Sequence, residues 1–200
     1  MDVIHHAYMG YQFDETQSIK VGVTQVPFGL LPYAAHSFWF GATYYIGFED
    51  DYDAGIHYQY QHDNLRVDLA YFANDEYGQG TRFDRYSFDV ATTEKSPYQE
   101  AGQLNTRIEY DLQQGEFNHK IGGSIQYGQL DFMANVSGLN PSANTDDINA
   151  FAGAAHWQAD WQKWQLQLQY LHYDYDVKNT NRIALSAFSY PFDIAAQADV

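Results

Sequence analysis

The sequence predicts an all-β fold, an antiparallel up-and-down transmembrane β-barrel. Three observations predict it. Many segments alternate apolar and polar residues, which gives a strand two unlike faces. The connections between them alternate between short and long, as in a barrel with tight turns at one rim and long loops at the other. Third, Tyr, Phe and Trp make up 18% of the 200 residues. We treat residues 1–200 as one barrel domain.

The predicted strands follow one another along the whole chain. The stretch KWQLQLQY at 163–170 shows the pattern most clearly, because every second residue is apolar and glutamines lie between. The apolar face also contains Gly and Ala, as in residues 151–161, and lipid tolerates these small residues better than a close-packed core does. We predict nine strands, near residues 3–13, 17–25, 53–62, 65–73, 104–112, 117–130, 150–161, 164–175 and 182–190.

The connections between the predicted strands are of two kinds. The short ones are Asp14–Thr16, His62–Asn64, Gln113–Glu116 and Gln162–Lys163. The long ones, at 26–52, 74–103 and 131–149, are rich in residues that form turns and loops. A fourth, at 176–181, is shorter.

Composition excludes several classes of protein. The net charge is -16, with 10 basic and 26 acidic residues, which excludes nucleic acid as a partner because phosphate binding requires a basic surface. Cysteine is absent, so no disulfide or thiolate chemistry is expected. The first ten residues lack the basic and apolar regions of a signal peptide. If the protein is exported, we expect its leader to have been removed or the segment to be part of a longer chain.

The polar faces of the strands define candidate pore-lining residues. A pore wall of mixed charge creates a transverse field that orients solutes and tunes ion preference. The alternative is cross-strand ion pairing that only stabilises the wall. By face parity the residues predicted to line the lumen are Lys20, Arg66, Asp68, Arg107, Glu109, Asp111, Lys120, Gln165, Gln167, Gln169 and Arg182.

Aromatic residues near the ends of two strands suggest a girdle at the membrane surface. Amphipathic rings favour the level of the lipid headgroups. Ordinary cross-strand aromatic pairing is the alternative. The predicted girdle residues are Trp157, Trp161, Trp164 and Tyr170.

One part of the chain resembles a known family. KVGVTQVPFG at 20–29, Pro32, YYIGFEDDYDAGIHYQY at 44–60 and LAYFANDE at 69–76 resemble Gram-negative outer-membrane porins, in particular the phosphate-selective porin O and P group and its relatives. The resemblance implies a sixteen-stranded homotrimer in the outer membrane with a loop folded into the pore. Nine strands and the non-aromatic end at Val200 depart from that pattern, so we expect a partial barrel.

The first long connection contains two further candidate sites. Within 26–52 the aromatic run Phe38, Trp39 and Phe40 is too apolar for a freely solvated loop. It could form a constriction loop, stack on sugars, or pack at the rim. The carboxylates that follow, Glu49, Asp50, Asp51 and Asp53, could bind Ca²⁺ or Mg²⁺, although a solvated loop or a divalent bridge to lipopolysaccharide fits them better.

These observations together favour an outer-membrane channel for passive diffusion of small polar solutes or ions, in contact with bilayer lipid and lipopolysaccharide. The acidic net charge would repel anions, so we expect weakly selective or cation-tolerant conductance. No nucleophile cluster is recognisable, so we expect no enzyme activity, no cofactor and no metal beyond divalent cations at the acidic loops. The alternative is a soluble β-sandwich that binds carbohydrate.

Overall fold

The computed structural model describes residues 6–31, 51–75, 98–132, 148–176 and 193–198. All regular structure in these ranges is β-strand, and none of it includes a helix long and apolar enough to span a membrane. The strands are β1 (Ala7–Gln12), β2 (Gln17–Gln25), β3 (Tyr52–His62), β4 (Leu65–Asp75), β5 (Tyr98–Gln114), β6 (Phe117–Phe132), β7 (Ile148–Trp161), β8 (Trp164–Asp176) and β9 (Asp193–Ala198).

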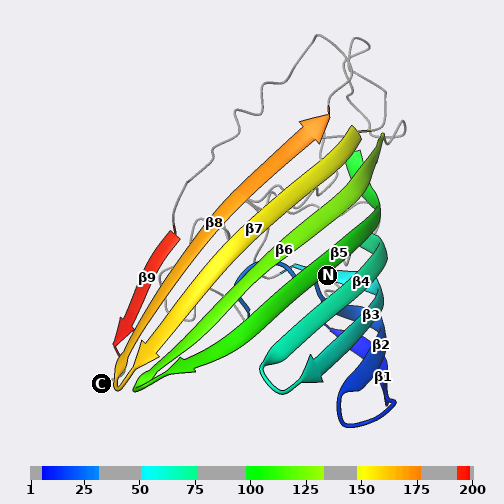
Figure 1. The fold of residues 1–200 in the computed structure, drawn as a ribbon. Coiled ribbons are helices and arrows are strands. Elements are labelled where there is room, and N and C mark those ends of the chain that lie inside the picture. The colour runs from blue at the N-terminus through cyan, green and yellow to red at the C-terminus, as the bar shows by residue number, and fades with distance from the viewer. Residues whose placement is uncertain (1–5, 32–50, 76–97, 133–147, 177–192, 199–200) are drawn as a thin grey trace.

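The strands form one sheet whose spatial order is the order of the chain. Each strand pairs antiparallel with the next, from β1 to β9. The predicted all-β, antiparallel up-and-down arrangement is therefore confirmed. Figure 1 shows the sheet as long, tilted strands that form one curved surface, with β1 and β9 as its two edges. We call the concave side of this sheet the hollow. The described strands thus form an open curved sheet and not a closed barrel, and the sixteen-stranded parent stays a prediction.

Most strand boundaries agree with the sequence prediction. The first eight predicted segments each overlap one observed strand. β5 starts at Tyr98, six residues before the predicted start at 104. The predicted ninth strand, 182–190, lies outside the described residues, and the strand that pairs with β8 is instead 193–198.

The short connections are tight hairpins. Asp63, Gly115 and Gln162 have φ values of 49°, 64° and 53°. Positive φ at a turn position gives a two-residue hairpin the twist that its flanking strands need. Three short connections therefore bring successive strands together without an intervening loop.

The two faces of the sheet differ sharply, and the strand register explains why. One row on the outer face crosses six strands, through residues that are all exposed: Val21, Ile56, Tyr71, Leu104, Tyr127 and Phe151. The opposite, inner face buries polar side chains, among them His57, Asn105, Ser124, His156, Gln167 and Gln169. Water-soluble domains bury apolar residues and expose polar ones, so the distribution here is inverted.

Two paired glycines allow close approaches to neighbouring strands, Gly22 of β2 to β1 and Gly55 of β3 to β4. Gly22 on β2 lies opposite Gly55 on β3. A Cβ on Gly22 would lie 2.3 Å from the Ala7 carbonyl oxygen, and one on Gly55 would lie 2.1 Å from the Tyr71 carbonyl oxygen. Gly22 has a φ of 132°, and the register of β3 and β4 shifts beside Gly55. Glycines and bulges bend a sheet, so this pair contributes to its curvature.

The chain turns inward after β2. Residues Val26–Leu31, here called the strap, lie against the inner face. Val26, Phe28 and Leu30 are buried. Val26 and Phe28 pack with inner-face residues of three strands, β4, β7 and β8, namely Ala70, Phe72, Ala152, Ala154, Leu171 and Tyr173. This cluster is the main apolar core of the described residues.

Candidate functional site

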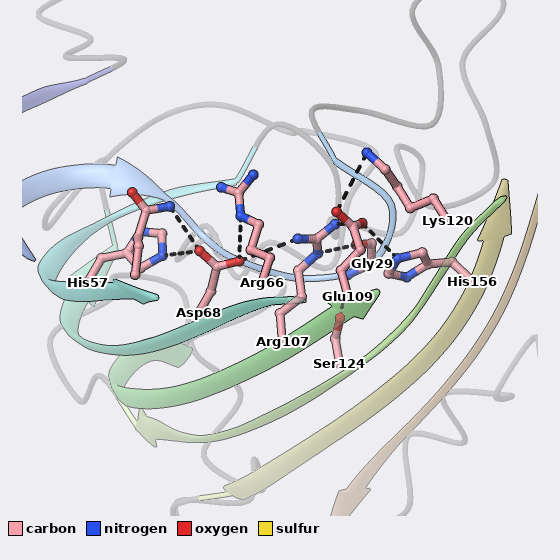
Figure 2. A network of polar contacts seen from close by, with 10 residues as sticks. Gly29, His57, Arg66, Asp68, Arg107, Glu109, Lys120, Ser124 and His156 are labelled. Atoms are coloured by element: carbon pink, nitrogen blue, oxygen red, sulfur yellow. Dashed lines mark hydrogen bonds and ion pairs between the residues drawn. The ribbon is translucent and has the colours of Figure 1, made fainter. Parts of the chain in front are cut away.

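A network of charged side chains spans the inner face beneath the strap. Strand register brings its members together, because Asp68 on β4 lies opposite Arg107 on β5, and Arg66 lies opposite Glu109. Two histidines extend the network, His57 from β3 and His156 from β7 (Figure 2). With Lys120 from β6, the network links five consecutive strands, β3 to β7, in one connected set of contacts.

The carboxylate of Asp68 has four partners. Its Oδ1 atom lies 3.0 Å from His57 Nε2 and accepts a hydrogen bond of 2.9 Å from the Gln59 amide. Its Oδ2 atom lies 3.3 Å from Arg66 Nε and 3.3 Å from Arg107 Nη1. Both oxygens are thus compensated, which a buried carboxylate requires.

The carboxylate of Glu109 lies at the other end of the network. It accepts a hydrogen bond from Arg107 Nη2, and its Oε2 atom lies 3.1 Å from His156 Nε2. Lys120 Nζ lies 3.6 Å from Oε1. The contact with His156 crosses β6 because Gly122 lies between the two residues in the register and has no side chain. A Cβ there would lie 2.4 Å from His156 Nε2.

Burial separates the network into a sealed part and an accessible part. The side chains of Arg107 and Asp68 are each 1% exposed. Arg66 is 41% exposed and Lys120 is 29% exposed. A buried charge is tolerated only when it is paired, and Arg107 meets this condition through two carboxylates. Solvent reaches the basic groups at the margins and not the guanidinium at the centre.

The strap closes over this centre. Arg107 Nε donates a hydrogen bond of 2.8 Å to the Gly29 carbonyl oxygen. The Gly29 N–H donates to Ser124 Oγ at 2.9 Å, and the Leu30 N–H donates to Gln169 Oε1 at 2.6 Å. Three side chains, from β5, β6 and β8, thus hold two consecutive residues of the strap.

The strap crosses the hollow and does not follow the wall. β2 and β8 are six strand spacings apart along the sheet, an arc of roughly 29 Å at about 4.8 Å per spacing. Leu30 is only five residues beyond Gln25, the end of β2, which is at most about 18 Å of extended chain. The Gln169 side chain covers only part of the difference, so the strap is a chord across the curved sheet.

Glutamine and aspartate side chains form a second polar group on β7 and β8. Asp160 accepts hydrogen bonds from Gln158 at 2.8 Å and from Gln165 at 2.7 Å. Gln167 donates to Gln158 at 3.1 Å. Amides that bond one another cover this part of the inner face with neutral donors and acceptors.

The predicted pore-lining residues can now be placed. All those in the described part of the chain lie on the inner face by strand register. Five of them are buried: Asp68, Arg107, Glu109, Gln167 and Gln169. Lys20, Arg66, Lys120 and Gln165 are half-buried, Asp111 is exposed, and Arg182 lies outside the described residues. The contacts of Asp68, Arg107 and Glu109 fit the alternative, cross-strand ion pairing. A pore-lining role stays a prediction.

The predicted girdle residues lie on the outer face. Trp161 pairs directly with Trp164 across the β7–β8 hairpin, and Phe117 stacks on Trp161 with ring centroids 5.6 Å apart. Trp161, Trp164 and Tyr170 are exposed, whereas Trp157 is half-buried and stacks on His119 at 5.8 Å. Cross-strand stacking therefore accompanies the arrangement, and the girdle itself stays a prediction.

The remaining candidates fall partly outside the structure. Phe38, Trp39, Phe40, Glu49 and Asp50 lie outside the described residues.

Asp51 and Asp53 are buried, and the Gln103 amide donates to Asp53 at 3.5 Å. The interpretation as a solvated loop is therefore wrong for these two carboxylates, because both are buried.

Sequence reasoning missed five members of the site: Gly29, His57, Gln59, Ser124 and His156. Face parity could have placed both histidines beside the carboxylates, since each lies on the polar face of its strand. The contacts of Gly29 had no such signal, because 95 residues separate Gly29 from Ser124.

Comparison with protein families, with curated proteins and with solved structures finds no match to this chain. The resemblance to porins is therefore carried by the quoted motifs alone.

Proposed function

We propose that the chain forms the wall of an outer-membrane channel through which small polar solutes or ions diffuse passively. The inverted distribution of side chains carries this proposal. Large apolar residues are exposed on every strand from β1 to β8, whereas charged and amide groups are buried on the inner face. Contiguous exposed apolar surface on this scale requires a cover, and bilayer lipid covers the outside of a transmembrane barrel.

Two further features support lipid as the cover. Small residues such as Gly123 and Ala155 share the outer face with the large ones, and lipid needs no tight side-chain fit. The hairpin ends of β6, β7 and β8 bring Phe117, Trp161 and Trp164 together, as expected for rings at a membrane surface. A carbohydrate-binding sandwich would need two sheets with the rings between them, and the described strands form one sheet with the rings outside.

The inner face supports passage of polar solutes. Its exposed and half-buried groups include Lys20, Arg66, Asp111, Lys120 and Gln165, so both signs of charge and neutral amides meet the hollow. With a net charge of -16, the channel would be weakly selective or tolerant of cations. Contact with lipopolysaccharide and assembly as a homotrimer belong to the same proposal, and no catalytic step is part of it.

Reconstitution into planar lipid bilayers tests the proposal. The purified protein should give stepwise conductance, and the reversal potential in a KCl gradient should be close to zero or on the cation side. Heat-unfolded protein at the same concentration is the control. A monodisperse protein that needs no detergent and gives no conductance would overturn the proposal, and strong anion selectivity would overturn the predicted ion preference.

A further inference from the structure

We infer that Arg107 is a positioning residue that latches the strap to the inner wall, and that its charge does not act on passing solutes. The second half rests on the proposed channel function, whereas the first half concerns the fold alone. The other arginine and the lysine of the network, Arg66 and Lys120, have contact with solvent. Arg107 differs from both in its burial and in its contact with the strap.

The guanidinium of Arg107 is held in one orientation. Nη1 lies 3.3 Å from the Asp68 carboxylate and Nη2 donates to Glu109, so carboxylates fix two of its three nitrogens. The third, Nε, donates to the Gly29 carbonyl oxygen. A planar guanidinium offers donors in fixed directions, so the two carboxylates aim Nε at the strap.

The strap is built to accept this latch. Gly29 has a φ of 65°, which disfavours other residues, and a Cβ there would lie 2.6 Å from Gln169 Oε1. Its N–H and carbonyl groups both bond to the wall, to Ser124 and Arg107 respectively. A backbone without a side chain can therefore approach the wall closely enough to bond on both sides.

The charge of Arg107 is screened from the hollow. Its side chain is 1% exposed and faces two carboxylates. Arg66 shares Asp68 with it, and Lys120 shares Glu109, but both reach solvent. A solute in the hollow meets these half-exposed cations, so they, and not Arg107, set the ion preference of this part of the wall.

A spin label on the strap tests the latch without any need for channel activity. The chain contains no cysteine, so Leu31→Cys offers one labelling site, half-buried at the end of the strap. In detergent, the label should be immobile in the parent and mobile in Arg107→Gln. Arg66→Gln is the matched control, because it removes an ion pair to the same Asp68 but no strap contact.

Single-channel conductance tests the second half of the inference, that the charge of Arg107 does not act on passing solutes. Release of the strap from the hollow widens the path, so Arg107→Gln should raise single-channel conductance and shift the reversal potential less than Arg66→Gln does. Arg66→Gln should shift the reversal potential toward cations and leave the label immobile. If Arg107→Gln does not fold, Ser124→Ala, which keeps all charges, should still increase label mobility.

An immobile label in both Arg107→Gln and Ser124→Ala would overturn the latch, as would equal mobility in Arg66→Gln. A reversal potential that moves in Arg107→Gln as much as in Arg66→Gln would overturn the screening of its charge. Failure of the proposed channel function gives a different result. Every variant, including the parent, would then lack conductance, and the spin-label result would not be affected.

Discussion

An arginine introduced at the middle of the outer face would test whether that face contacts lipid. Ile121 on β6 is 49% exposed and lies four residues beyond Phe117 on the same face. With a rise of about 3.4 Å per residue and a tilt of about 40°, Ile121 lies roughly 10 Å from the level of Phe117. An apolar band about 25 Å tall has its midplane about 12 Å from its edge, so in the proposed bilayer, with Phe117 at the edge of the band, Ile121 would lie close to the midplane.

Ile121→Arg should therefore lower the free energy of unfolding by about 2–4 kcal/mol, the cost of Arg at the bilayer midplane of a β-barrel. In the same proposed arrangement Tyr127, ten residues beyond Phe117, would lie at the opposite edge of the band, where the same change costs about 0–1 kcal/mol. Tyr127→Arg is thus the matched control on the same strand and face, and it is similarly exposed.

Urea unfolding in lipid vesicles, followed by the fluorescence of the four tryptophans, measures both free energies. Equal losses of stability in the two variants would contradict a lipid-facing outer face. So would a loss of less than about 0.5 kcal/mol in Ile121→Arg, as expected for a residue that faces water.

Three further changes test the site. Gly122→Val would place a Cβ 2.4 Å from the β7 histidine, and overpacking of this kind should cost about 1–3 kcal/mol in urea unfolding. Asp68→Asn should cost about 3–5 kcal/mol because it removes one of the two carboxylates that pair the buried Arg107, whereas exposed Asp111→Asn should change the free energy of unfolding little. The pKa of Asp14 is lowered because the Thr16 hydroxyl and N–H donate to it. Its contribution to stability is therefore present above about pH 4 and lost as the pH falls toward the lowered pKa, so Asp14→Ala should reduce the acid dependence of unfolding, measured by circular dichroism.

The sequence predicted the strands well because their signal is local. Alternation at Leu65–Phe72 or at Trp164–Tyr170 needs no knowledge of distant residues, and tight turns at Asp63 and Gln162 mark where strands end. The early start of β5 was missed because residues 98–103 contain the bulge beside Gly102, which interrupts the alternation.

The site was predictable only in part. Face parity put Asp68, Arg107 and Glu109 on one surface, but it gave no sign that Arg107 would bond to the strap. The strap is also held by the bond from the Leu30 N–H to Gln169, across 139 residues of sequence. Such a contact follows from the curvature of the whole sheet, which a local pattern does not contain.

The agreement between strand order and chain order has a consequence for assembly. Each strand can add to the one made just before it, so loop closure entropy stays small and the sheet can grow hairpin by hairpin. The strap is the exception, because its partner Gln169 belongs to β8. The strap emerges early from the ribosome, yet its set of contacts is complete only after β8 is in place, so complete docking requires that β8 has joined the sheet.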